Sequence, residues 1–402
     1  MPAPTRHSSC MTAVLPSDAQ PRRAAANLVA GGHRPLGVTT ARRMTGAAMT
    51  NLPLTRAPAD PGDAERPTLK TIALRTGLAI ATVSRALKDA PDIGEETKRR
   101  VRAMAKELGY RPNRAGVRLR TGKTNVIALV LSAESDVMNH TARLIYSIAN
   151  ALRGTTYHLI VTPYFPDQDP MDPIRYIVET ESADAIILNQ TKPDDPRVRY
   201  MTDRGFPFAT HGRTEMGINH PYFDFDNEVF AHLAVQALVD QGRRRLLLIP
   251  PPRAHCYARH MITGFAAAAA EAGVPFEVMT AADSDSGGTR IEAAMDERLA
   301  QPLRPDGFLC ASTTATMALI AAAEQAGLTI GRDFDVVAKE AIRFLRQFRR
   351  EILLVHEDVG RAGDFLARAT VSAIERRATE MGQCLERPER VERATDERRD
   401  TK

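Results

Sequence analysis

Residues 68–123 constrain the fold of this chain more than any other segment. Their sequence predicts three short helices in succession and then a basic arm. The first two helices, Thr68–Arg75 and Ile80–Leu87, are separated by a turn at Gly77, and the third spans about Glu95–Leu108. This order is typical of a helix-turn-helix that is followed by a third, packing helix and a basic segment that contacts DNA phosphates. We therefore expect this segment to bind double-stranded DNA.

Apolar residues at three- and four-residue spacing give each of the first two helices one face for packing. These residues are Leu69, Ile72 and Ala73 in the first helix, and Val83, Ala86 and Leu87 in the second. The opposite face of the second helix carries Thr82, Ser84, Arg85 and Lys88. An α-helix fits the major groove, where base edges present distinct donors and acceptors. Arg85 is expected to contact a guanine or a phosphate, and Ile80 and Ala81 to meet thymine methyl groups. A lone arginine is as often a solvated helix charge, but this setting favours DNA.

The charge of the chain is distributed unevenly. Residues 68–123 hold fourteen basic and five acidic side chains, a net charge of +9, while the whole chain carries +5. Residues 1–67 contribute +4, which leaves −8 for residues 124–402. A basic head on an acidic body is typical of a DNA-binding domain attached to a second domain with another role.

The head closely resembles the lactose/galactose-repressor family of bacterial transcription regulators. The resemblance lies in T-L-K-T-I-A from Thr68, A-T-V-S-R-A-L from Ala81, K-R-R-V from Lys98 and E-L-G-Y-R-P-N-R from Glu107, and it continues weakly to about residue 370. The resemblance implies a sequence-specific transcriptional regulator, of the repressor type, that binds a pseudo-palindromic operator as a homodimer. A small-molecule effector in the cleft of the second domain is expected to modulate its operator binding. Within the matching motifs, Thr68, Leu69, Asn113 and Arg114 join the candidate DNA contacts.

In that family the helix after Pro-Asn-Arg is a hinge that folds on the operator, and a leucine in it inserts into the minor groove. Leu119 stands at the matching position. An apolar wedge of this kind kinks DNA toward the major groove. Two departures weaken local helix formation. Gly116 replaces a usual alanine, at a cost of about 1 kcal/mol, and Ala79 replaces a capping serine, at a similar cost of about 1 kcal/mol.

From Asn125 onward, short apolar runs alternate with helical stretches. The runs lie at 126–131, 157–162, 185–188, 206–210, 245–249, 307–310, 335–337 and 352–355, and the helices at 139–152, 172–181, 227–241, 259–272, 289–300 and 314–326. Alternation of this kind predicts βαβ units and parallel sheets, and about 260 residues are too many for one small sheet. We expect an α/β body of two lobes. The resemblance implies the same, as a pair of lobes like those of periplasmic binding proteins.

Ligands in open parallel sheets bind beyond the carboxyl ends of the strands. Polar side chains in those loops are therefore candidate effector contacts: Asp136, Asn139, Asn189, His211, Arg213, Tyr257, Arg259, Ser312, Lys339 and Glu340. Each of these residues, considered alone, is more often structural. Several positions depart from the family's sugar- and purine-binding patterns, including Met261, Ser312-Thr313 and Glu340-Ala341. The effector is accordingly expected to be a small polar metabolite, of which a sugar is one kind.

The remaining composition excludes several classes of function. The four cysteines are scattered, without the spacing of a disulfide framework or a zinc site, and no H-E-x-x-H, P-loop or G-x-S-x-G motif occurs. We predict no catalytic residues, no metal site and no cofactor. No apolar run is long enough for a bilayer, so a cytoplasmic, nucleoid-associated protein without membrane contact is expected. A solute-binding protein without a DNA role is the alternative that the body alone would permit, and an enzyme on the α/β body is a third.

These interpretations divide the chain into five segments. They are a disordered extension at 1–67, the helix-turn-helix at 68–112, the hinge at 113–123, an effector-binding and dimerisation domain at 124–375, and a charged, disordered tail at 376–402. The extension has two interpretations: an over-extended start, with translation beginning near Met44 or Met49, or a basic arm that adds DNA affinity.

Overall fold

The computed structural model describes residues 67–111, 118, 122–133, 138–375 and 382–393. Several positions singled out in the sequence lie outside the described residues: the extension before Pro67, Asn113, Arg114, Leu119, Asp136 and the side chain of Asn139.

Three helices follow one another in residues 67–111: α1 (Leu69–Thr76), α2 (Ile80–Leu87) and α3 (Glu95–Glu107). Thr68 caps α1, because its hydroxyl accepts a hydrogen bond from the Thr71 N–H while the Thr71 hydroxyl accepts one from the Thr68 N–H. Gly77 ends α1 in the left-handed region at φ +67°, where a β-carbon would be strained. Ala79 precedes α2 and makes no side-chain cap, as its replacement of a serine predicts. The predicted helices are confirmed to within a residue at each end.

The three helices enclose a small core that contains the predicted stripes. The buried members are Ile72, Ala73, Val83, Ala86, Val101 and Ala105. Lys98 is also buried, and its ammonium lies 2.7 Å from a Glu95 carboxylate oxygen and 3.1 Å from one of Asp89. This lysine therefore anchors α3 to the turn after α2 rather than contributing to an exposed basic surface.

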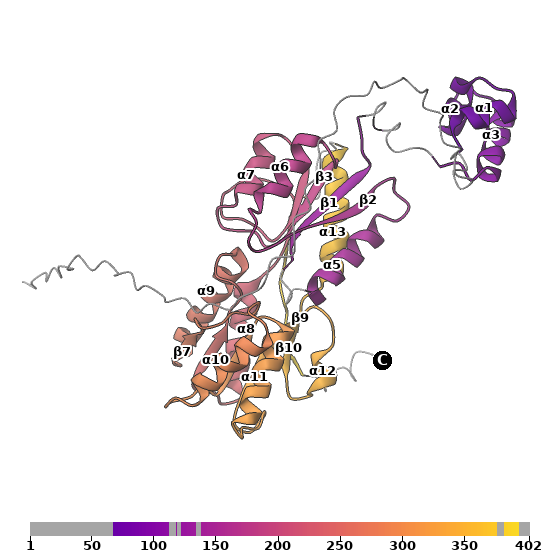
Figure 1. The fold of residues 1–402 in the computed structure, drawn as a ribbon. Coiled ribbons are helices and arrows are strands. Elements are labelled where there is room, and N and C mark those ends of the chain that lie inside the picture. Colours follow the sequence, from indigo (N-terminus) through magenta and orange to yellow (C-terminus); the bar gives the residue numbers. More distant parts are fainter. Residues whose placement is uncertain (1–66, 112–117, 119–121, 134–137, 376–381, 394–402) are drawn as a thin grey trace, which may run out of the picture. The chain divides into compact units, whose positions relative to one another are not determined.

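The first lobe is built on a six-stranded parallel sheet in the order β11-β5-β4-β3-β1-β2. Its strands are β1 (Val126–Ser132), β2 (His158–Tyr164), β3 (Ala185–Leu188), β4 (Phe208–His211), β5 (Tyr222–Phe225) and β11 (Gln383–Glu386). Helices α5 (Met138–Ala151) and α13 (Val359–Ile374) cover one face, and α6 (Met171–Thr180) and α7 (Pro196–Asp203) cover the other (Figure 1).

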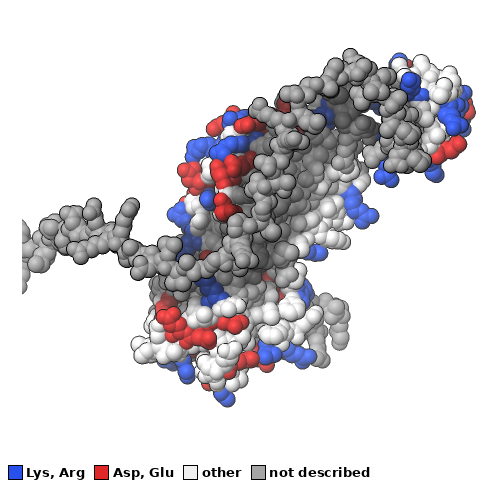
Figure 2. Space-filling view, in the orientation of Figure 1, with Lys and Arg blue, Asp and Glu red and all other residues white. Residues whose placement is uncertain are grey.

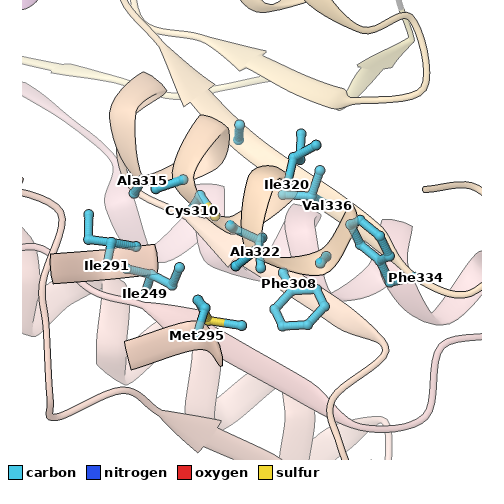
Figure 3. Close-up of a cluster of buried hydrophobic side chains, with 14 of the residues drawn as sticks. Ile249, Ile291, Met295, Phe308, Cys310, Ala315, Ile320, Ala322, Phe334 and Val336 are labelled. Carbon is cyan, nitrogen blue, oxygen red and sulfur yellow. The ribbon is translucent and has the colours of Figure 1, made fainter. Parts of the chain in front are cut away.

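The second lobe has a six-stranded sheet in the order β12-β10-β9-β8-β6-β7, parallel except for the edge strand β12. Its strands are β6 (Leu246–Ile249), β7 (Phe276–Val278), β8 (Gly307–Cys310), β9 (Asp335–Glu340), β10 (Leu353–His356) and β12 (Glu392–Arg393). Helices α8 (Asn227–Asp240) and α9 (Cys256–Glu271) lie on one face, while α10 (Gly288–Leu299), α11 (Thr313–Gln325) and the short α12 (Leu345–Phe348) lie on the other. Figure 3 shows the core beneath α10 and α11, where Phe308 and Phe334 meet edge to face.

Central strands are buried on both faces, which explains their uninterrupted apolar runs. In β1, Ile127, Leu129 and Leu131 enter the core beneath α5 and α13, whereas Val126, Ala128 and Val130 enter the core beneath α6 and α7. A parallel strand covered by helices on both sides has no face on which polar residues would be tolerated. The predicted α/β body of two lobes is confirmed.

The chain passes between the two sheets three times. It leaves the first sheet after β5, returns to it from β10 through α13, and leaves it again between β11 and β12. Strand ends of both sheets therefore lie beside the crossing segments, and the pocket described below is built there.

The prediction that residues 376–402 form a disordered tail is wrong for their central part. Gln383–Glu386 pairs in parallel with Tyr222–Phe225, and Glu392–Arg393 pairs antiparallel with Leu354–Leu353. Charged composition misled the prediction, because an edge strand needs only one apolar face and gains its stability from backbone hydrogen bonds. The second domain accordingly extends beyond residue 375 to at least residue 393.

Candidate functional site

The helix-turn-helix places the predicted base-contacting side chains on one exposed side of α2. Ile80, Ala81 and Arg85 are exposed, while Thr82 and Ser84 are half-buried at its border. Val83 and Ala86 occupy the opposite, buried side. Figure 2 shows lysine and arginine side chains at several places on the visible face of this unit, beside a smaller acidic patch.

Two of the predicted DNA contacts already have partners within the head. Arg85 forms an ion pair with Asp92 that is more than two-fifths exposed on both sides, so solvent and a phosphate can compete with it. Thr68 is exposed but its hydroxyl serves the capping box, and Leu69 packs partly against the core. Contact of these residues with DNA stays a prediction.

A pocket of about 1020 Å³, a volume that includes open solvent, lies at the carboxyl ends of strands from both sheets. β3, β4 and β5 bring Asn189, His211 and Asp224 to it, and β8 and β9 bring Ser312 and Lys339. Further polar lining comes from His140, Gln190, Asn227, Tyr257, Ser284, Asp285, Thr313, Thr314 and Glu357. The edge of both sheets to which the strand-end rule points thus carries a pocket.

A lysine and a glutamate form the charged centre of the pocket. The Lys339 ammonium lies 2.8 Å from a Glu357 carboxylate oxygen and donates a hydrogen bond of 3.2 Å to the Asn227 side-chain oxygen. It also stands 5.1 Å from the centre of the Phe225 ring. Burial alone would raise the pKa of Glu357, but Lys339 and the neighbouring imidazoles hold that pKa well below its usual value. Glu357 is therefore a carboxylate at neutral pH.

Two histidines stand on the other side of Glu357. The His140 and His211 ring centres are 5.0 Å apart, and their Nε2 atoms lie 3.6 and 3.9 Å from Glu357 Oε1. Burial, reinforced by His140 and Lys339 and opposed by the Glu357 carboxylate, lowers the pKa of His211 to about 3. Its imidazole is consequently neutral at physiological pH, with a lone pair on one ring nitrogen.

Asp224 is a buried carboxyl with an incomplete set of partners. Arg213 Nη1 stands 3.4 Å from Asp224 Oδ2, and that oxygen accepts no hydrogen bond from the described residues. Burial raises the pKa of Asp224 to about 7, although Arg213 opposes the shift. Asn189 Oδ1 is likewise buried and accepts no hydrogen bond within the described part of the chain. Both oxygens are available to a ligand that donates hydrogen bonds.

The structure brings five of the ten predicted effector residues to the pocket wall: Asn189, His211, Tyr257, Ser312 and Lys339. Three others do not line it. Arg213 stands behind Asp224, and Arg259 forms an exposed ion pair of 2.8 Å with Glu215. Glu340 is buried, where its carboxylate accepts hydrogen bonds from the Leu345 N–H at 3.2 Å and from Arg346 at 3.4 Å. These three side chains have structural partners instead.

Sequence reasoning missed several lining residues. Glu357 follows a strand that the pattern had predicted, so the strand-end rule could have found it. Asp224 lies inside β5, which was not predicted because a carboxylate interrupts its apolar run. His140 belongs to the first turns of α5, where no sequence signal points at the pocket.

Comparison with known proteins agrees with this architecture. Residues 68–113 match the model of the bacterial regulatory proteins of the lacI family, and residues 235–395 match a periplasmic binding protein-like domain. The HTH-type transcriptional regulator AglR of Rhizobium meliloti is 32% identical over 282 residues, which cover 68% of this chain and 78% of that protein. This chain belongs to the lacI family. It is a transcriptional regulator with a helix-turn-helix DNA-binding domain.

Other relatives and solved structures show the same organisation. The regulator RafR of Escherichia coli is 36% identical over 191 residues, covering 47% of this chain and 56% of that protein. A lac repressor dimer bound to operator and the anti-inducer ONPF superposes with a TM-score of 0.73 at 18% identity, covering 82% of this chain and 99% of that one. A complex of the regulator CelR with cellobiose gives a TM-score of 0.59 at 23% identity, covering 81% and 98%. Among the described residues, none of the helices combines the length and apolarity needed to cross a membrane.

The raised pKa of Asp224 predicts a pH-dependent change in stability. Between the ordinary value of 3.8 and about 7, the folded state binds more protons at this carboxyl than the unfolded state does. The carboxyl therefore lowers the free energy of unfolding as pH rises through this window, by at most about 1.4 kcal/mol for each pH unit. The Asp224→Asn variant should gain stability over the unchanged protein as pH rises from about 5 to about 8, measured by urea unfolding. Asp203→Asn, at an exposed helix end, is the matched control, and an equal gain in both variants would contradict the assignment.

Proposed function

We propose that this regulator is an operator-binding repressor whose DNA affinity is set by a small molecule in the interlobe pocket. The observation that carries the proposal is the combination, in one chain, of an exposed reading face on α2 with a polar pocket at the strand ends of two sheets. A plain solute-binding protein would not need the first feature. Binding without turnover is also proposed, because AglR, which matches over 68% of this chain, is a transcriptional regulator.

A neutral, polyhydroxylated molecule suits the pocket best. The central charges of Lys339 and Glu357 are matched, so this pair offers no net charge to an ionised organic ligand. Asn189 Oδ1 and Asp224 Oδ2 need hydrogen-bond donors, and buried acceptors left unsatisfied cost about 1–3 kcal/mol each. Hydroxyl groups both donate and accept, and the Tyr257 and Phe225 rings offer apolar surface to a sugar ring. The cellobiose carried by the CelR structure is consistent with a ligand of this class.

Ligand and operator are expected to bind as linked events. The pocket is lined from both sheets and borders the crossing segments, so a ligand that contacts both lobes favours one of their arrangements. If the ligand changes the affinity for operator by a given factor, the operator must change the affinity for ligand by the same factor.

The Asn189→Ala variant tests the ligand proposal. Loss of a buried hydrogen-bond acceptor should weaken the binding of a fitting sugar by about tenfold, because one hydrogen bond in such a site contributes about 1–1.5 kcal/mol. A thermal-shift panel of mono- and disaccharides on the full-length protein first identifies a stabilising sugar. Calorimetry then measures the affinity of that sugar for the unchanged protein, the Asn189→Ala variant and a control variant. Asn219→Ala, outside the pocket, is the control. A panel in which no sugar stabilises the protein counts against a sugar, and equal affinity in all three proteins counts against the site.

The Arg85→Ala variant tests the reading face of α2. If Arg85 contacts a base or phosphate, specific operator affinity should fall by about 1–3 kcal/mol, which is roughly five- to 150-fold. Fluorescence polarisation with DNA selected by the unchanged protein measures this loss. Arg99→Ala removes an exposed arginine of the same charge from α3, where it pairs with Glu96, and should retain most of the affinity. Undiminished specific binding by Arg85→Ala would refute this orientation of the head.

A homodimer is proposed, with the β2 edge of the first sheet as its interface. Edge strands expose unpaired backbone groups, and β2 also exposes Ile160 and Val161, one on each face of the sheet. Phe165, just after β2, and Tyr146 of α5 are exposed as well. Apolar side chains gathered at a sheet edge are typical of an association surface. A two-fold dimer would present two heads to a palindromic operator.

The Ile160→Lys variant tests this surface. A buried, unpaired ammonium at an interface is strongly unfavourable, so sedimentation velocity should show a monomer at concentrations where the unchanged protein is a dimer. Leu303→Lys, at another exposed apolar position, should leave the sedimentation coefficient unchanged. If the Ile160→Lys variant is still a dimer, the interface lies elsewhere. If the unchanged protein is a monomer, the dimer proposal is wrong.

A further inference from the structure

The strongest unassigned feature of the molecule is the cluster of His140, His211 and Glu357. One nitrogen from each imidazole and one carboxylate oxygen lie within 4.8 Å of one another on the pocket wall. We propose that these three side chains bind one divalent transition-metal ion, of the Zn²⁺ class, and that the ion presents an open coordination position to the pocket. The site lies in the pocket assigned above to the effector, but ion binding requires no assumption about that effector.

The distances fit three ligands of a single ion. Zinc binds imidazole nitrogen and carboxylate oxygen at about 2.0–2.2 Å, so two ligands of a tetrahedral ion stand roughly 3.4 Å apart. Glu357 Oε1 is 3.6 Å from His140 Nε2 and 3.9 Å from His211 Nε2. Both separations are long for a direct hydrogen bond. All three ligand atoms lie within 4.8 Å of one another, so the side chains would close toward one another to hold an ion.

The donor set also suits the ion chemically. Each of the three side chains offers one ligand atom to the same point, two imidazole nitrogens and one carboxylate oxygen. Two imidazoles with one carboxylate are a nitrogen-oxygen set that zinc, cobalt, nickel and ferrous iron accept. The second oxygen of Glu357 pairs with Lys339 at 2.8 Å, which leaves the first oxygen to face the histidines.

The three ligands come from separate parts of the fold. His140 is in α5, His211 ends β4, and Glu357 lies in the crossing between β10 and α13. An ion here would fasten the crossing segment to the first lobe. Three protein ligands leave a fourth position of a tetrahedral ion for water or a ligand oxygen, and all three residues line the pocket.

Lys339 provides a test in which removing a pocket side chain should increase metal affinity instead of lowering it. Its ammonium is close enough to repel a divalent cation at the cluster, since like charges a few ångströms apart in a half-buried site interact by several kcal/mol. Removing this charge in the Lys339→Met variant should therefore increase metal affinity. If the histidines and Glu357 were only a polar cluster, removal of Lys339 would not create or strengthen a saturable metal site.

The experiment titrates full-length protein, freed of metal by a chelator, with Zn²⁺ by calorimetry and with Co²⁺ by its visible absorption. We expect saturation at about one ion per chain. Loss of a ligand in His140→Ala or Glu357→Gln should weaken binding by at least about tenfold, the lower bound known for supporting residues. His232→Ala removes a half-exposed histidine outside the cluster and should bind as the unchanged protein does.

Circular dichroism of each variant establishes that it is folded, and Glu357→Gln provides a second probe if His140→Ala is not. The proposal is overturned if the protein shows no saturable metal binding, or if the unchanged protein and both ligand variants bind the metal with equal affinity. Weaker metal binding by the Lys339→Met variant would also overturn it. The result is separable from the proposed function, because metal binding is measured without sugar or DNA. If no sugar stabilises the protein but zinc binding depends on the cluster, the metal site is supported and the sugar proposal is not. If a sugar binds but zinc does not, the sugar proposal is supported and the metal site is not.

Discussion

Burial of parallel strands on both faces is the constraint on which the rest of this structure depends. Each sheet is covered by helices on either side, so its only accessible backbone is at the strand ends and edges. Polar side chains cannot be placed along strands such as β1 or β3 without entering a core. They collect instead where the strands end, and the two sheets together bring many of them to one pocket.

Electrostatics within that pocket follow from the same burial. A carboxylate at Glu357 is stable only because Lys339 and the imidazoles compensate for its desolvation, whereas Asp224 has a weaker partner and shifts its pKa to about 7. Two carboxyl groups in one pocket thus differ in charge state because their neighbours differ. This contrast gives the pocket both a fixed charge pair and an acceptor whose protonation changes near neutral pH.

Periodicity and spacing were sufficient to predict the elements with regular patterns. The helix boundaries of the head and strands β3 and β8 agree with the structure, because a sharp turn or an unbroken apolar run defines each of them. Strands β5 and β11 were missed, since Asp224 interrupts one and charged neighbours surround the other. Both are held by backbone pairing with each other, which no single-sequence pattern displays.

The pocket was predictable only in part for a related physical reason. The strand-end rule brings loops to the correct edge but does not tell which side chains turn inward. Arg259 and Glu340 follow the rule in sequence, yet Glu215 and the N-terminus of α12 satisfy them elsewhere. His140, His211 and Glu357 are separated by 71 and 146 residues along the chain, so metal-ligand spacing could not reveal their proximity.

The helices that flank this cluster provide a physical route from the pocket to the rest of the first lobe. α5 begins beside His140 and α13 begins just after Glu357, and the two helices pack closely along their length. At Gly363 a β-carbon would stand 1.9 Å from Ser147 Oγ and 3.0 Å from the Ile148 backbone nitrogen. The Ser147 hydroxyl also donates a hydrogen bond of 3.2 Å to the Val359 carbonyl. Helices packed this closely move as one body, so a ligand or ion that shifts Glu357 relative to His140 must either strain this contact or move both helices together.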